Sequence, residues 1–213
     1  MAIWSYTDRW EVAPLYRKNH DGIAVVCGTS PWLTADIPPH WFRIGVNGSR
    51  TVLPIDAWVG MDEPETHGIE AARAANMKFY RGTFSEMRIG SIPVKLLPNS
   101  YFIDVSEKAQ PLPVVKNDAF LWLSSGIIVA IQLAMYMGYS RIVLNGVDFE
   151  DAGKYIDGSK CANAAIQQGW YDGLAAAVVS IAETAKEWGF QFYSTRDNRL
   201  NLPHCSALLD SQL

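Results

Sequence analysis

Short apolar runs alternate with amphipathic or fully apolar helical stretches along the chain. Residues 22–27 are continuously apolar and rich in β-branched side chains, and the run ends at Gly28-Thr29-Ser30-Pro31. Such a run is typical of a strand that is buried on both faces, as in a parallel sheet. Further strands are expected at residues 41–46, 55–61, 77–80, 92–97, 101–105, 141–144 and 190–194.

Three segments carry a helical pattern. Residues 127–137 are apolar on nearly all sides and are followed by Gly138, a residue suited to ending a helix in the left-handed conformation. Residues 173–188 place Val178, Ile181 and Ala185 on one face, and a shorter helix is expected at residues 66–76. Strands that alternate with helices in this order predict an α/β fold of the Rossmann-like type, with a mostly parallel sheet and helices on both faces.

One domain accounts for the whole chain. Residues 1–213 are interpreted as a single nucleotide-binding α/β domain, in which residues 21–80 form the first βαβ part and residues 117–213 form the second. Residues 81–116 between them are expected to be a variable connection or a flap, because irregular stretches of this length are often functional.

Composition narrows the class of protein. The 213 residues are 49% hydrophobic and have a formal net charge of −4, without a basic run, so general nucleic-acid binding is not expected. The first ten residues lack the features of a secretion signal, and no stretch approaches the ~20 apolar residues of a membrane span, which predicts a cytoplasmic protein. The three cysteines show no CxxC spacing, so no disulfide framework or zinc site is signalled.

Two strand-end turns are candidates for binding a phosphate. Ser124, Ser125 and Gly126 precede an apolar helix, whose first turn presents unpaired N–H groups and the positive end of the helix dipole. Gly28, Thr29 and Ser30 form a second turn, which matches neither the Walker loop nor GxGxxG. An ordinary helix cap is the alternative for the first turn. If both turns follow parallel strands, they open at the same edge of the sheet.

Carboxylates and amides stand at other strand ends. Asp62 and Asp148 are candidates for holding Mg²⁺ against phosphates or, in the case of Asp148, for acting as a general base, and turn formation is the alternative. Asn47 and Asn145 each stand beside a glycine where a strand ends. Their amides suit either the recognition of a base or sugar or a tight turn.

The segment from Trp122 to Phe149 carries a family resemblance. Its order of Ser124-Ser125-Gly126, apolar helix, Gly138-Tyr139, strand and Gly146-Val147-Asp148-Phe149 resembles a stretch of the bacterial sialyltransferases that cap lipooligosaccharides. It is also similar to the DUF115 proteins, which include archaeal hydroxymethylpterin pyrophosphokinases.

The resemblance also bears on single residues. It places Tyr155 near a tyrosine that contacts the donor phosphate in the sialyltransferases. The histidine that those enzymes carry before the last helix is absent here, and Asp172 stands in that region as a different candidate base.

Together the two turns and the resemblance predict a nucleotide-dependent transferase, most simply a glycosyltransferase that uses a nucleotide-activated sugar and an unidentified acceptor. Asp148 or Asp172 would activate the acceptor hydroxyl. Two alternatives stay open: a Mg²⁺-dependent pyrophosphokinase or phosphotransferase with Asp62 and Asp148 as metal ligands, and a non-catalytic nucleotide-binding module. Mg²⁺ is the one cofactor considered, and subunit contacts in a homo-oligomer are left open.

Overall fold

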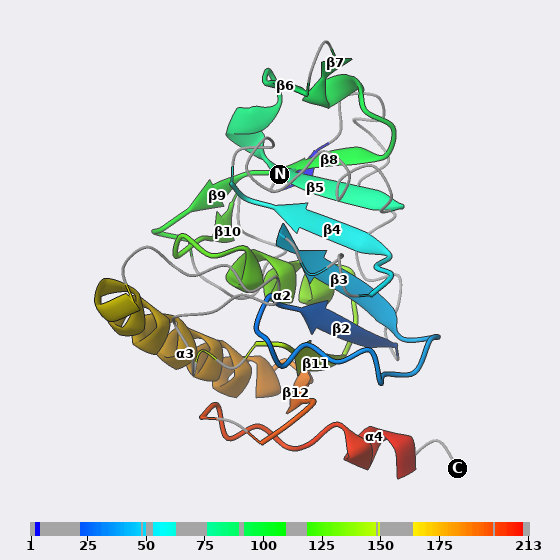
Figure 1. Ribbon diagram of the computed structural model, residues 1–213, viewed down its shortest axis with the longest axis vertical. Helices are drawn as coiled ribbons and strands as arrows, with labels where there is room; N and C mark the ends of the chain where they lie inside the picture. Colours follow the sequence, from blue (N-terminus) through cyan, green and yellow to red (C-terminus); the bar gives the residue numbers. More distant parts are fainter. Residues whose placement is uncertain are drawn as a thin grey trace.

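A computed structural model describes residues 3–4, 22–47, 49, 53–62, 76–89, 92–109, 119–147, 149, 164–197 and 199–210. At its centre lies an eight-stranded sheet with the order β1-β8-β5-β4-β3-β2-β11-β12 (Figure 1). All neighbouring strands are parallel except the β1–β8 pair. The strands are β1 (Ile3–Trp4), β2 (Ile23–Cys27), β3 (Phe42–Val46), β4 (Ala57–Gly60), β5 (Met77–Arg81), β8 (Ser100–Ile103), β11 (Arg141–Asn145) and β12 (Gln191–Ser194).

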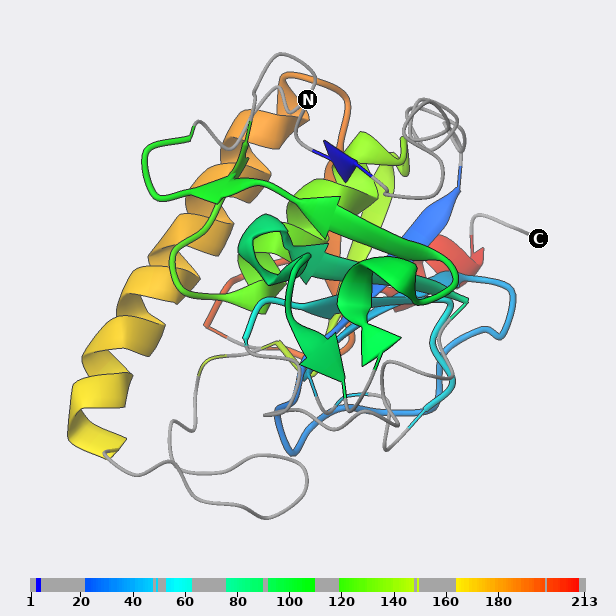
Figure 2. The same ribbon diagram turned by 90° about the horizontal axis from the view of Figure 1, so that it is seen from above.

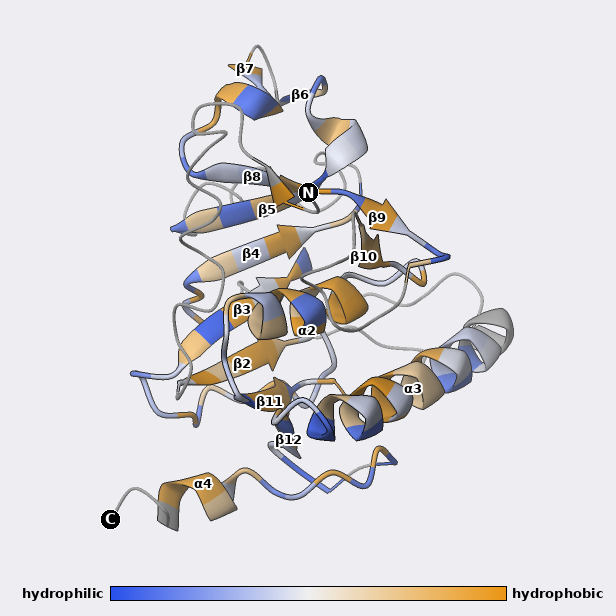
Figure 3. Cartoon of the chain, turned by 180° about the vertical axis from the view of Figure 1, so that it is seen from behind, coloured by the Kyte–Doolittle hydropathy of each residue, from blue (hydrophilic) through white to orange (hydrophobic). Residues whose placement is uncertain are grey.

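Different elements pack on the two faces of the sheet. Helices α2 (Gly126–Tyr136) and α3 (Ala164–Lys186) pack on one face, where α3 runs alongside the sheet (Figure 2). The other face is covered by apolar side chains from the β2–β3 connection and from the short helix α4 (Ser206–Asp210), among them Leu33, Trp41 and Leu208. The central strands are hydrophobic along most of their length (Figure 3), as expected for strands covered on both faces. The predicted α/β fold class is therefore confirmed.

The connection after β5 differs from the prediction. Residues 92–97 form not one strand but β7 (Ile92–Pro93) followed by the 3-10 turn η4 (Val94–Leu96), because the Leu97 N–H donates back to the Val94 carbonyl at 3.1 Å instead of extending a ladder. β7 pairs with β6 (Arg88–Ile89) beyond the 3-10 turn η3 (Gly82–Phe84). Within the expected flap of residues 81–116, β8 is a strand of the main sheet, and β9 (Val105–Ser106) pairs in parallel with β10 (Phe120–Leu121).

The predicted helices are found with one change of boundary. α2 matches residues 127–137 closely, whereas α3 begins at Ala164 rather than near Gly173. Gly169 and Gly173 lie inside α3, where a Cβ atom would meet nothing within 4 Å. Two exposed glycines cost a helix only about 1 kcal/mol each, so the long helix continues through them. The helix expected at residues 66–76 lies outside the described residues, apart from Asn76.

The order of the strands creates a switch point. The chain runs from β2 outward through β3, β4, β5 and β8, and then returns to place β11 on the other side of β2. In open parallel sheets, ligands bind beyond the carboxyl ends of the strands where the order reverses in this way. The boundary between β2 and β11 is therefore the position of the sheet at which a ligand is expected.

The turns that follow β2 and β11 touch each other at this boundary. The Gly28 N–H donates to the Asn145 carbonyl at 2.8 Å, and the Ser30 N–H donates to the Gly146 carbonyl at 3.2 Å. A Cβ atom added to Gly28 would lie 2.1 Å from the Gly146 oxygen, so only glycine permits this approach. Gly146 itself has a φ of 65°, in the region that favours glycine.

We expect Gly28→Ala to lower the free energy of unfolding by about 2 kcal/mol or more, because the methyl group forces the two turns apart. Gly173→Ala is the matched control, since its methyl group meets open space on a helix, and this change is expected to raise the free energy by about 0.5–1 kcal/mol. Urea denaturation measures both. Equal effects of the two substitutions would contradict the described contact.

Candidate functional site

The first turn of α2 lies at the edge formed by the carboxyl ends of the strands. A Cβ atom added to Gly126 would be 3.6 Å from Val46 Cβ and 4.0 Å from Asn47 Oδ1, at the end of β3. β3 pairs with β2 in the register that sets Cys27 opposite Gly45. The structure thus brings Gly126 and Gly28 to the same edge of the sheet, with Gly126 beside the end of β3 and Gly28 directly after the neighbouring β2.

The residue at the N-cap position of α2 does not cap the helix with its side chain. Ser125 occupies the cap position with an extended backbone, but its side chain makes no cap hydrogen bond, and no acidic residue stands in the first turn. Ser124 before it has a φ of 54°, a left-handed conformation that is uncommon for serine. The positive end of this 11-residue helix is therefore not neutralised by the groups that usually do so.

A buried glutamine fixes the segment that leads into α2. Gln132 Nε2 donates to the Leu121 carbonyl at 2.8 Å, and Gln132 Oε1 accepts from the Leu121 N–H at 2.9 Å. Gln132 is fully buried in an otherwise apolar helix. Its two hydrogen bonds to β10 hold the approach to Ser125 in place, a role that its polarity within an apolar run could have signalled.

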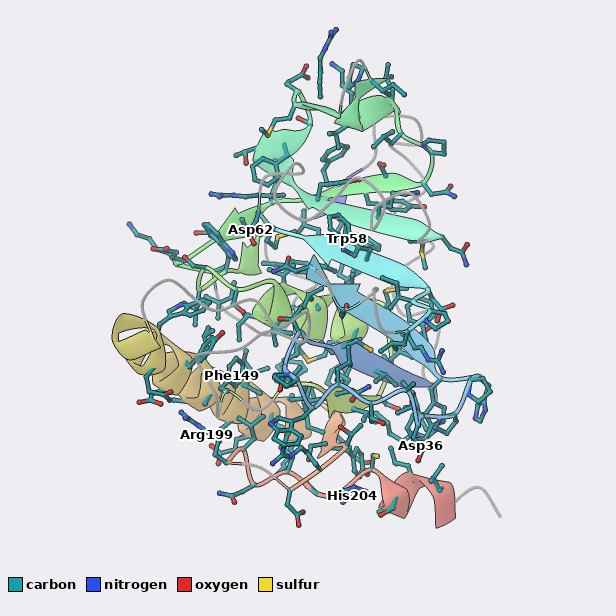
Figure 4. All side chains as sticks on the ribbon, in the orientation of Figure 1. Asp36, Trp58, Asp62, Phe149, Arg199 and His204 are labelled. Carbon is teal, nitrogen blue, oxygen red and sulfur yellow. The ribbon has the colours of Figure 1, made fainter. Side chains whose placement is uncertain are left out.

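Asn47 presents an unsatisfied amide beside the start of α2. Its backbone has a φ of 47°, and its carbonyl accepts from Trp58 Nε1 at 3.0 Å (Trp58 is labelled in Figure 4). Asn47 Oδ1 is buried without a hydrogen-bond partner. A carboxamide can present either an acceptor or two donors by turning over, so Asn47 is suited to a polar ligand at this edge.

Arg81 and Trp122 add a cation that the sequence did not point to. Arg81 ends β5, and its Cζ atom lies 4.0 Å from the centre of the Trp122 ring. Trp122 is four residues before Gly126 in the chain. The Nε atom of Arg81 and the Nε1 atom of Trp122 are both buried without a hydrogen-bond partner. Among the described residues, Arg81 has no ion-pair partner, so its charge is available to an anion.

The turn after β2 is held mainly by its own hydrogen bonds. The Leu33 N–H donates to the Ser30 carbonyl at 3.0 Å, and the Trp32 N–H donates to Ser30 Oγ at 3.2 Å. Gly28 is buried against Gly146, whereas Thr29 and Ser30 are half-buried. The geometry of the glycine is thus explained by chain packing, and a ligand contact of Thr29 or Ser30 stays a prediction.

Asn145 is occupied by the chain itself. It is fully buried; its Nδ2 donates to the Thr34 carbonyl at 2.8 Å, while its Oδ1 accepts from the Thr34 N–H at 3.1 Å and from Thr195 Oγ1 at 3.2 Å. The sequence left open whether this amide binds a ligand or shapes a turn. With these three hydrogen bonds it positions two chain segments, and we leave it out of the proposed ligand contacts.

Asp172 forms an ion pair on α3. Its Oδ1 accepts from Arg199 Nη2 at 2.6 Å and from Gln168 Nε2 at 3.0 Å. The hydrogen bond from Arg199, followed by that from Gln168, lowers the pKa of the Asp172 carboxyl below its ordinary value. A carboxylate with a lowered pKa is a weaker base, which does not favour the predicted catalytic role. Arg199 Nη1 also donates to the Phe149 carbonyl at 3.1 Å, next to Asp148 in the chain.

The remaining candidates lie apart or outside the described residues. Asp62 is exposed just after β4, at the same edge of the sheet (Figure 4). Asp148 and Tyr155 lie outside the described residues, so the expected pairing of Asp62 with Asp148 on Mg²⁺ stays a prediction. In the described ranges, no group of three or more His, Cys, Asp and Glu side chains is placed to hold a metal ion.

Two further side chains play structural parts. Cys27 is buried beside the turn, and burial raises the pKa of its thiol to about 12, which makes it a poor nucleophile. His204 Nε2 lies 2.9 Å from the Thr195 carbonyl, and its Nδ1 accepts from the Ser206 N–H at 3.2 Å, so His204 holds the C-terminal segment together.

Comparisons with known proteins give one distant likeness. No family model and no curated protein matches the chain. A solved structure of the sialyltransferase CstII from Campylobacter jejuni, in complex with the substrate analogue CMP-3FNeuAc, is similar to it with 10% identity and a TM-score of 0.49 over 86% of this chain and 85% of that chain. The resemblance to DUF115 proteins stays a prediction. No helix in the described part of the chain is long and apolar enough to cross a membrane.

An NMR titration of the Asp172 carboxyl tests the ion pair. Because the pKa is lowered in the folded protein, the pair is intact above the ordinary value of 3.8 and is lost as the pH falls through the lowered midpoint. We expect a midpoint below 3.8 in the wild-type protein and a return toward that value in Arg199→Gln. An unchanged midpoint in Arg199→Gln would show that the pair does not form.

Proposed function

We propose that this chain is a nucleotide-dependent transferase that takes a nucleotide-activated sugar as its donor. The observation that carries the proposal is the N-terminus of α2, which the Ser125 side chain does not cap and which lies at the carboxyl edge of a parallel sheet beside the unsatisfied Oδ1 atom of Asn47. Helix N-termini bind phosphates through their free N–H groups and their dipole. Arg81, which stacks on Trp122 and has no ion-pair partner among the described residues, would supply a full positive charge to the same edge.

These groups are proposed to bind the donor. Its phosphate is proposed to receive hydrogen bonds from the backbone N–H groups of Ser125 and Gly126 and from the hydroxyls of Ser124 and Ser125. Its nucleoside would extend along Thr29 and Ser30 toward Asn47, and Tyr155 is proposed as a further contact to the phosphate. The switch point between β2 and β11 supports this placement, since it separates the two connections that must flank a bound ligand.

The proposed reaction is the transfer of the sugar to a hydroxyl group. The acceptor oxygen attacks the anomeric carbon, and the bond between that carbon and the phosphate oxygen breaks. The nucleotide leaves with the electron pair, and Asp148 is proposed to take the proton of the acceptor hydroxyl. The amides of α2 and the guanidinium of Arg81 would stabilise the negative charge of the leaving nucleotide.

Asp172 is proposed as a positioning residue. Through Arg199 it fixes the Phe149 carbonyl, and Phe149 follows the proposed base. The acid–base step itself would then belong to Asp148 rather than to Asp172, whose pKa the ion pair lowers.

Calorimetric titration with CMP-, UDP- and GDP-sugars tests the donor site. We expect one of these nucleotide classes to bind without added Mg²⁺, and Ser125→Ala to weaken that binding several-fold while the free energy of unfolding changes by less than about 0.5 kcal/mol, because the hydroxyl makes no cap bond. A folded sample that binds none of the three classes would sink the proposal. Binding of ATP or GTP that requires Mg²⁺ would instead indicate the phosphotransferase.

The division of roles predicts different kinetics for two substitutions. Asp148→Asn should abolish transfer and leave donor affinity unchanged, because it removes the proton acceptor alone. Asp172→Asn should lower the rate only partly, with the pH profile retained, and Arg199→Lys should keep part of the activity. The readout is turnover of the donor bound in the titrations. If the protein binds the donor without turning it over, and if Asp148→Asn and Asp172→Asn leave that binding unchanged, the chain is a non-catalytic binding module.

A further inference from the structure

The second face of the sheet carries a cleft that the proposed donor site does not use. It has a volume of about 790 Å³ and lies between two segments, residues 32–39 of the β2–β3 connection and residues 195–209 of the C-terminal part. Asp36 and His204, labelled in Figure 4, stand one on each wall. Ligand pockets have volumes of roughly 300–1,000 Å³, so the cleft is large enough for a small molecule.

The cleft is held open by hydrogen bonds beneath it. The fully buried Asn145 side chain binds Thr34 on one wall and Thr195 on the other. The Cys205 N–H donates to the Ser194 carbonyl at 2.8 Å and ties the second wall to β12. The walls are thus fixed relative to each other by hydrogen bonds to a fully buried amide, and the cleft exists before any ligand binds.

An aromatic platform stands at one end of the cleft. The Trp32 side chain is 55% exposed, although tryptophan is among the residues that gain most from burial. The Cζ atom of Arg196 lies 4.4 Å from the centre of its ring. The polar side chains of Thr34, Asp36 and Ser206 line the same cleft. An exposed ring flanked by hydroxyl, carboxylate and guanidinium groups matches a ligand with apolar faces and many hydroxyl groups.

The position of the cleft links it to the proposed donor site. Thr34 and Thr195 both bind Asn145, the last residue of β11, directly beside the contact of Gly28 with Gly146. The inner end of the cleft therefore reaches the carboxyl edge of the sheet at the switch point. The N-terminus of α2 opens at this same edge from the opposite face. The two regions therefore lie at one edge of the sheet, on its opposite faces.

We infer that this cleft binds the acceptor, and that the acceptor is an oligosaccharide whose ring stacks on Trp32. The inference rests on the proposed function, since it assigns the second substrate of the same transfer. A nucleotide is the less suitable occupant, because the helix at the cleft, α4, has only five residues and offers no anion site comparable to the start of α2.

The test uses the full chain on a printed array of neutral and acidic oligosaccharides, with nucleotide-sugar titrations run in parallel. Trp32→Ala should lower binding to the retained oligosaccharides at least tenfold and leave nucleotide-sugar affinity unchanged. Trp188→Ala is the matched control, because Trp188 is 53% exposed on α3's C-terminal side and is not among the cleft residues. It should change array binding less than twofold. Thermal melting checks that both variants are folded.

The outcomes separate the two proposals. If nucleotide-sugars bind but the wild-type protein retains no oligosaccharide, or Trp32→Ala retains them as well as the wild type, the acceptor cleft is overturned and the donor site stands. If Trp32→Ala loses nucleotide-sugar binding instead, the cleft is a nucleotide site and the inference is again overturned. Oligosaccharide binding without any nucleotide-sugar binding would overturn the transferase and with it the acceptor role of the cleft, and would leave the cleft as an oligosaccharide-binding site.

Discussion

The contact of the Gly28 turn with the Gly146 turn is the constraint on which the rest of the arrangement depends. Two parallel strands end side by side, and their following turns approach until a Cβ atom on Gly28 would lie 2.1 Å from the Gly146 oxygen. From this point one connection leaves for each face of the sheet. The first becomes a wall of the cleft on one face, and the second leads toward α3 on the other. This backbone contact thus fixes where one wall of the cleft begins and where the connection to α3 begins.

Three residues at the carboxyl edge of the sheet carry polar atoms that the described chain does not satisfy. Asn47, Arg81 and Trp122 each have a buried polar atom without a partner. An unpaired buried donor or acceptor costs about 1–3 kcal/mol, and native proteins contain few of them. Gln132 and its two hydrogen bonds to Leu121 show that this chain does satisfy a buried amide where only structure is at stake. Other buried polar atoms of the described residues also lack a partner, among them Trp41 Nε1 and Tyr80 Oη, so it is their position at the carboxyl edge of the sheet that makes Asn47, Arg81 and Trp122 candidates for contacting a polar ligand.

The sequence was informative wherever a local pattern determines the structure. Apolar β-branched runs predicted the central strands. The uninterrupted apolar stretch after Gly126 predicted α2, because a helix that is buried on all sides is apolar on all sides. The prediction was wrong at residues 92–97, where the chain enters the 3-10 turn η4 directly after Pro93, and at the start of α3, which lies nine residues before Gly173.

Contacts between distant residues were beyond the sequence. An asparagine at the end of a strand looks the same whether it faces a ligand or another segment of the chain. Asn145 binds Thr34, 111 residues away, and nothing local to either residue signals this. Arg81 was missed for the same reason, since its meaning comes from Trp122, which the chain reaches only after building β8 and β10. The shared edge of the Gly28 and Gly126 turns was a topological expectation, and it holds because both follow from a parallel sheet.

The C-terminal segment makes hydrogen bonds both beneath the cleft and beside the proposed base. Thr195 binds Asn145 beneath the cleft, and four residues later Arg199 binds both Asp172 on α3 and the Phe149 carbonyl. One short stretch of chain thereby fixes a wall of the cleft and the backbone beside the proposed base. A transferase must hold its acceptor and its proton acceptor in a constant relation, since a misplacement of about 1 Å can cost a hundredfold in rate. Anchoring the acceptor cleft and the proposed base to the same segment is a direct way to hold the two in a constant relation. This role would explain why the segment after β12 is hydrogen-bonded to the sheet without being a strand or a long helix.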